Sequence, residues 1–94
     1  MNKINHNVID DLYYLEPIIH EDKRGYFYES FCDKNFHKTN FVQDNESFSL
    51  RGVLRGIHFQ KSPYQQSKLV RVIVGEIQDV AVDLRPNSKT YKKY

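Results

Sequence analysis

An arginine and a histidine lie three positions apart in the apolar stretch VLRGIHFQ, residues 53–60, with a glycine between them. Histidine suits general acid or base catalysis because its unperturbed pKa, about 6.5, lies near physiological pH. In a strictly alternating strand Arg55 and His58 would point to opposite faces. A bulge at Gly56 would allow both side chains to project to the same side. We therefore expect Arg55 and His58 to share one site.

A lysine and an aspartate are brought together by the hairpin that we expect around Gly75. The flanking runs KLVRVIV (68–74) and IQDVAVDLR (77–85) are rich in β-branched residues. A two-residue type II′ turn that begins at Gly75 places Lys68 directly opposite Asp83. This pair is either an ordinary cross-strand ion pair on a solvated face or part of a concave site. The other face of the hairpin is apolar and contains Leu69, Ile73, Val80, Val82 and Leu84.

Strand patterns dominate the elements that must position these side chains. GYFYESF (25–31) is rich in aromatic residues, and FVQDNESFS (41–49) alternates with the period of two expected of a strand. Only CDKNFHKTN (32–40) indicates a short helix or turn. Several short strands separated by turns predict an all-β sandwich or barrel. We assign structural roles to the remaining histidines, which are His6, His20 and His37.

Length and composition restrict the classes of protein that this chain can be. Its 94 residues allow one small domain, residues 1–94. A formal net charge of +2 gives no electrostatic basis for binding nucleic acid or an acidic membrane surface. The single cysteine, Cys32, and the lack of a leader-like start favour a reducing cytoplasmic setting. No apolar run approaches the roughly 20 residues that span a bilayer, so we expect a soluble protein.

Four blocks of the sequence together resemble one known family. They are DKRGYFYESF, FVQDNESFS, RGVLRGIHFQ and KLVRVIVGEIQDVAVDLRPNSKTYKKY, which occur in order and with consistent spacing between about Leu15 and Tyr94. This pattern resembles the dTDP-4-dehydrorhamnose 3,5-epimerase family. The resemblance implies a cupin-like jelly roll, a homodimer, and an enzyme that uses no cofactor and no metal. It also implies a role in making activated L-rhamnose for cell-surface polysaccharides.

The resemblance implies catalytic roles for two residues, and the hairpin register adds a third. The reaction removes hydrogens beside a sugar ketone, and the resulting carbanion spreads its charge onto the carbonyl oxygen. The family's base corresponds to His58, and the lysine that stabilises the developing enolate corresponds to Lys68. Asp83, which the hairpin register places opposite Lys68, would hold that ammonium group in position. Lys68 and Asp83 can then form an ion pair and also belong to the catalytic site.

The same resemblance implies contacts to the nucleotide-sugar substrate. Guanidinium groups match phosphate oxygens in a bidentate fork, and two arginines occupy the family's diphosphate-binding positions. The implied substrate-binding residues are Arg24, Glu29, Gln43, Asn45, Arg55 and Lys68. In the family the segment from Arg24 to Glu29 reaches into the neighbouring subunit's site. We therefore expect a homodimer with exchanged N-terminal strands.

Members of this family are about twice as long as this chain, so we expect it to represent the N-terminal half of the barrel. The other half supplies the family's tyrosine general acid, the aspartate that orients the base, and a second histidine. The strands of half a barrel expose apolar faces and unpaired edges, a recognised cause of association. We therefore expect the chain to be stable only when it pairs with another copy.

Three other functions are compatible with the sequence. A metal-dependent cupin shares the expected fold, but GIHFQ offers one histidine without a near neighbour, whereas metal sites need clustered ligands. A catalytically incomplete module that binds nucleotide sugars is a stronger alternative. The third is an epimerase or ketoisomerase acting on another nucleotide-linked keto sugar, because no residue identifies the base or the distal sugar substituents.

Overall fold

The structure of the chain is a computed structural model that describes residues 1–36 and 38–94. Its regular elements all lie in the first part of the chain. They are the strands β1 (Asn2–Asn5), β2 (Tyr13–Glu16), β3 (His20–Asp22) and β4 (Gly25–Phe27) and the 3₁₀ helix η1 (Asp33–Phe36). The described residues form no α-helix, which agrees with the expected all-β class. The assignment made for His37 lies outside the described residues.

Strands β1 and β2 form an antiparallel hairpin that pairs Asn2 with Glu16 and Asn5 with Tyr13. The pairing places Tyr13 diagonally across from Lys3, and the ammonium nitrogen of Lys3 lies 3.5 Å from the centre of the Tyr13 ring. Residues 6–12 connect the two strands and are closed by a 2.8 Å hydrogen bond from the His6 amide to the Leu12 carbonyl. The hairpin is therefore fixed by its ladder, by a cation–π contact and by its connecting loop.

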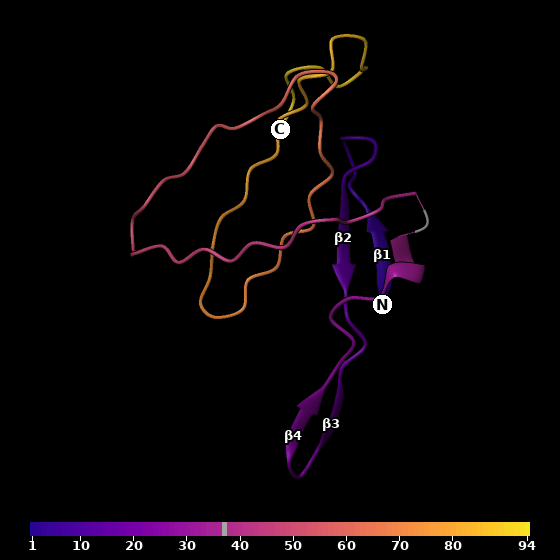
Figure 1. The fold of residues 1–94 in the computed structure, drawn as a ribbon, viewed down its shortest axis with the longest axis vertical. Coiled ribbons are helices and arrows are strands. Elements are labelled where there is room, and N and C mark those ends of the chain that lie inside the picture. The colour runs from indigo at the N-terminus through magenta and orange to yellow at the C-terminus, as the bar shows by residue number, and fades with distance from the viewer. Residues whose placement is uncertain (37) are drawn as a thin grey trace.

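A second antiparallel hairpin, β3–β4, projects away from the first (Figure 1). Asp22 pairs with Gly25 across a two-residue turn. Gly25 has a φ of +130°, a conformation that residues with a Cβ atom rarely adopt. All residues of both strands are exposed. The hairpin therefore extends from the body of the chain and packs little of its surface.

The expected helix or turn at 32–40 is confirmed by η1, and three aromatic rings surround it. The rings of Phe31 and Phe36 stack with their centres 5.4 Å apart, and Phe41 meets Phe36 edge to face at 5.3 Å. Such pairs contribute about 0.5–1.5 kcal/mol each beyond the area they bury. This cluster fixes η1 against the start of the following segment.

The expected strands at 41–49, 68–74 and 77–85 are not formed in the structure, where residues 41–94 trace wide open loops (Figure 1). The chain does bend at 73–75, with Gly75 at a φ of +91°, but no ladder joins the flanking segments. A strand needs a neighbour to satisfy its backbone groups, and β propensity reflects packing against that neighbour. Without such pairing, Val42 stays 85% exposed and Val74 stays 91% exposed.

Burial is sparse. The buried residues among those described are Ile9 and Asp83. The chain exposes 9625 Å² of surface, whereas a compact monomer of its mass, 11.2 kDa, would expose about 5,700 Å². Its radius of gyration of 15.7 Å also exceeds the roughly 12 Å of a compact domain of this length. None of the described residues form a helix long and apolar enough to cross a bilayer.

Candidate functional site

Arg24 lies in the turn of the β3–β4 hairpin and is held there by Asp22. The Asp22 carboxylate accepts hydrogen bonds from the Arg24 amide at 2.8 Å and from the guanidinium Nη2 at 2.6 Å. This pairing lowers the pKa of Asp22 and raises that of Arg24. The Arg24 side chain is nevertheless 90% exposed, beside an open hollow along the hairpin. Its guanidinium is therefore oriented but remains accessible to an anion.

The two amide residues expected to contact substrate lie together. The Gln43 side-chain nitrogen donates a 3.2 Å hydrogen bond to the Asn45 side-chain oxygen. The two residues are two positions apart, so their side chains can meet even though no strand forms there. Glu29 lies elsewhere and accepts a 3.2 Å hydrogen bond from the Asn35 side chain, at η1. The amide pair is thus formed, and Glu29 is linked to a different element.

Arg55 and His58 lie on an exposed, irregular segment that contains no strand and therefore no bulge of a ladder. Gly56 has a φ of +138°, so a glycine is required at this place even though no ladder is present. The Arg55 guanidinium donates a 2.8 Å hydrogen bond to the Phe48 carbonyl oxygen. Neither His58 nor Lys68 forms a hydrogen bond or ion pair with any described residue. Both side chains are exposed and accessible to a ligand.

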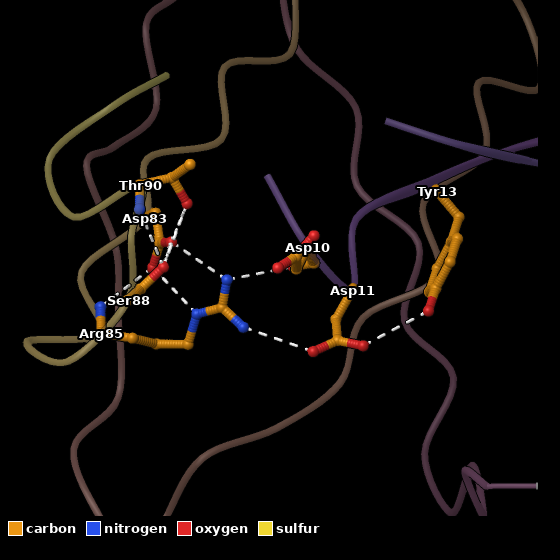
Figure 2. A network of polar contacts seen from close by, with 7 residues as sticks. All are labelled: Asp10, Asp11, Tyr13, Asp83, Arg85, Ser88 and Thr90. Carbon is orange, nitrogen blue, oxygen red and sulfur yellow. Dashed lines mark hydrogen bonds and ion pairs between the residues drawn. The ribbon is translucent and has the colours of Figure 1, made fainter. Parts of the chain in front are cut away.

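The expected pair of Lys68 and Asp83 is not formed in the structure, where Asp83 instead binds Arg85 (Figure 2). The physical reason is the missing ladder: without hairpin pairing, Lys68 is not brought opposite Asp83. The Asp83 carboxylate is nearly fully buried and accepts hydrogen bonds from Arg85, Ser88 and Thr90. These donors, Arg85 first, hold the pKa of Asp83 far below its usual range.

Two Asp-x-Arg sequences, DKR at 22–24 and DLR at 83–85, adopt the same local arrangement. In each, the aspartate accepts both the backbone amide and the guanidinium of the arginine two positions later. Sequence reasoning missed this arrangement at 83–85, although aspartate commonly bonds the backbone two residues on. The following polar run, PNSKT, also signals a turn rather than the continuation of a strand. Those two signals together indicate a turn that begins at Asp83, with Arg85 as the residue two positions on.

No metal site is present in the part of the chain that the structure describes. Residues 1–36 and 38–94 contain no group of three or more His, Cys, Asp or Glu side chains that could hold an ion. Cys32 is free and half-buried. Besides Glu29, the candidate residues with accessible polar groups comprise arginines, amides, one histidine and one lysine, which suit an anionic, oxygen-rich ligand.

Comparison with known proteins assigns the chain to a family. The family model for dTDP-4-dehydrorhamnose 3,5-epimerase matches residues 6–94. The chain therefore belongs to the dTDP-4-dehydrorhamnose 3,5-epimerase family. This membership confirms the resemblance found in the four sequence blocks. No solved structure matched the chain.

Curated relatives in this family cover nearly the whole chain, at about half identity. The chain is 52% identical over 91 residues to the dTDP-4-dehydrorhamnose 3,5-epimerase of Shigella flexneri and 54% identical over 90 residues to that of Methanothermobacter thermautotrophicus. It is 50% identical over 91 residues to that of Escherichia coli. Each match includes 92% of this chain but 48–50% of the relative. The chain thus spans about half the length of these epimerases.

Proposed function

We propose that this chain takes part in the epimerisation of a nucleotide-linked 4-keto-6-deoxy sugar, dTDP-4-dehydro-6-deoxyglucose, in the formation of dTDP-L-rhamnose. The observation that carries the proposal is the family match over residues 6–94, with relatives at about 50% identity. The proposed setting is the cytoplasm, where this nucleotide sugar would serve polysaccharide synthesis. The proposal requires neither a metal nor a cofactor.

His58 is the proposed base that removes a proton from a carbon beside the ketone. A neutral imidazole can accept this proton near physiological pH. Lys68 is the proposed cation at the ketone oxygen, where a fixed positive charge would stabilise the enolate that forms. Both side chains are exposed and have no described protein partner that would compete for these roles. For Asp83 to hold Lys68, as the sequence suggested, its carboxylate would have to leave Arg85.

The proposed contacts to the substrate come from the arginines and the amide pair. Arg24 and Arg55 would bind the diphosphate, because guanidinium groups form charge-assisted, bidentate hydrogen bonds with phosphate oxygens. Gln43 and Asn45, already in contact with each other, would present amide groups to the nucleotide sugar. Glu29 would contact the nucleotide. The hydrogen bond from the Arg55 guanidinium to the Phe48 carbonyl oxygen leaves other N–H groups of the guanidinium available.

The proposed assembly is a homodimer of single cupin-like jelly-roll domains, residues 1–94, with exchanged N-terminal strands. Two features support it. The β3–β4 hairpin projects from the chain with Arg24 at its turn (Figure 1), so it could reach a neighbouring copy. The chain also exposes 9625 Å², about 3,900 Å² more than a compact monomer of its mass. Association with another copy would cover part of this excess.

Solvent exchange into the substrate tests the proposal. The chain is incubated with dTDP-4-dehydro-6-deoxyglucose in D₂O, and deuterium at the carbons flanking the ketone is followed by NMR. We expect deuterium to enter at a rate above that of the buffer alone. Thermal stabilisation by dTDP without deuterium entry would instead favour a module that only binds nucleotide sugars. The same two measurements with other nucleotide-linked keto sugars would show which substrate is preferred.

A further inference from the structure

Arg85 connects two segments of the chain that are separated by more than seventy residues. Its guanidinium donates a 3.0 Å hydrogen bond to the Asp10 carbonyl oxygen and lies 3.3 Å from the Asp11 carboxylate (Figure 2). Both acceptors belong to the loop that joins β1 to β2. The same guanidinium also donates hydrogen bonds to the Asp83 carboxylate through Nε and Nη2. One side chain thus bridges the N-terminal hairpin and the last part of the chain.

The β1–β2 loop, which provides the two acceptors, is held in place by local contacts. Asp11 has a φ of +66°, a left-handed conformation that aspartate tolerates better than most residues. Its carboxylate also accepts a 3.3 Å hydrogen bond from the Tyr13 hydroxyl. The loop is further held by the His6 ring, whose Nδ1 accepts the amides of Val8 at 3.2 Å and Ile9 at 3.1 Å. The two acceptors are therefore presented on a braced loop.

The donor side is a closed turn over residues 83–93. The Asp83 amide donates a 3.0 Å hydrogen bond to the Lys93 carbonyl, and the Lys92 amide donates a 2.7 Å bond to the Asp83 carbonyl. Inside this turn, the hydroxyls of Ser88 and Thr90 each donate a 2.6 Å bond to the Asp83 carboxylate. The carboxylate therefore fixes both the turn and the direction in which the Arg85 guanidinium points.

The distribution of buried residues agrees with this connection. Among the described residues, the two buried ones are Ile9, 7% exposed, and Asp83, 4% exposed. Ile9 lies in the β1–β2 loop and Asp83 lies in the turn, so each of the bridged segments contains one. In a chain that exposes most of its apolar residues, the two described residues that are least exposed thus lie in the two segments that Arg85 joins.

We infer that Asp83 and Arg85 form a latch that fastens the 83–93 turn to the β1–β2 loop. The two residues have different tasks. Asp83 closes the turn and orients the guanidinium, and Arg85 makes the contacts to Asp10 and Asp11. Loss of Arg85 releases the β1–β2 loop while the Ser88 and Thr90 bonds still hold the turn. Loss of the Asp83 carboxylate loosens both segments. This inference is independent of the proposed catalytic function.

Amide hydrogen exchange of the full chain, followed residue by residue by NMR, tests the latch. In Arg85→Gln we expect faster exchange of the His6 and Ile9 amides and little change at the Lys92 amide. In Asp83→Asn we expect faster exchange of all three amides. Arg71→Gln is the matched control, because Arg71 is an exposed arginine with no ion pair among the described residues, and it should change none of them.

Two outcomes would overturn the latch. In the first, the His6 and Ile9 amides exchange at the wild-type rate in Arg85→Gln. In the second, the exchange rate in Arg85→Gln rises equally in every segment, including the β3–β4 hairpin. Arg85 would then stabilise the whole chain and not the contact between these two segments. If Arg85→Gln does not fold, Arg85→Lys keeps the charge but loses the fork. In Arg85→Lys the exchange rates of the His6 and Ile9 amides should rise less than in Arg85→Gln. Unchanged rates at both amides would also overturn the latch.

Discussion

The carboxylate of Asp83 forms a bidentate pair with the side of the Arg85 guanidinium, with Nε 2.9 Å from Oδ1 and Nη2 3.0 Å from Oδ2. The same arrangement occurs between Asp22 and Arg24, but in a different environment. The Asp22 side chain is 50% exposed, whereas that of Asp83 is 1% exposed and receives two further hydroxyl bonds. The first pair therefore leaves its arginine available to a ligand, and the second serves the fold.

Acid should destabilise the chain through Asp83. The folded state holds the pKa of this carboxyl below its usual range, so its contribution is complete above the unfolded pKa of about 3.9 and is lost as pH falls further. Arg85 faces the carboxylate and stays charged, and Asp10 and Asp11 lie beyond it. Thermal unfolding across acidic and neutral pH should show Asp83→Asn less stable at neutral pH, with the difference shrinking below about pH 4. A difference that stays constant through the acid range would contradict this account.

The aromatic cluster at η1 should contribute to stability. Phe36→Ala removes the contacts to Phe31 and Phe41, and at about 0.5–1.5 kcal/mol for each pair the loss is about 1–3 kcal/mol. Thermal or denaturant unfolding measures it. The control is Phe48→Ala, because Phe48 is 83% exposed and should change stability little. Equal effects of the two substitutions would show that the cluster is not formed in solution.

Arg24 should contribute to binding and not to stability. Its guanidinium is 90% exposed and held beside the hollow of the β3–β4 hairpin. A hydrogen bond to a charged group is worth about 1.5–3 kcal/mol, so Arg24→Gln should weaken dTDP binding by roughly ten- to a hundredfold. Calorimetric titration measures the affinity, and Lys23→Gln is the control from the same turn. Unchanged affinity in Arg24→Gln would remove this residue from the proposed site.

The chain should associate in solution. Its exposed surface exceeds that of a compact monomer by about 3,900 Å², and exposed apolar side chains such as Leu54 at 88% and Val74 at 91% form part of it. Sedimentation velocity over a range of concentrations should show a dimer or larger species. A compact monomer at every concentration would disprove this expectation.

The sequence predicted the family better than the arrangement of the chain. Family membership followed from four short blocks and was confirmed, and the turn at 32–40 was also foreseen. These features depend on residue identity or on local backbone preference, which one sequence contains. The strands at 41–49, 68–74 and 77–85 depend on partners, and no described segment pairs with them. Apolar periodicity alone cannot supply a neighbour for a strand.

The Asp83 pair shows the same difference between local and distant information. The predicted hairpin register paired Asp83 with Lys68, fifteen positions away, but the ladder that this pairing needs does not form. In the structure Asp83 pairs with Arg85, two positions away. The two residues lie in an aspartate-led turn that the sequence DLRPNSKT already indicates. The contact from Arg85 to Asp10 and Asp11, by contrast, joins the two ends of the chain, and no local pattern indicates it. The roles of His58 and Lys68 stay predictions.

Solvent-deuterium exchange in variants of His58 tests the central claim most directly. The wild-type chain, His58→Asn and the control Gln60→Ala, an exposed neighbour, are each incubated in D₂O with dTDP-4-dehydro-6-deoxyglucose. The account predicts that deuterium enters beside the ketone with the wild-type chain and with Gln60→Ala, and that entry falls to the buffer rate with His58→Asn. Entry at the wild-type rate with His58→Asn would contradict it, because the proton would then be removed by another group.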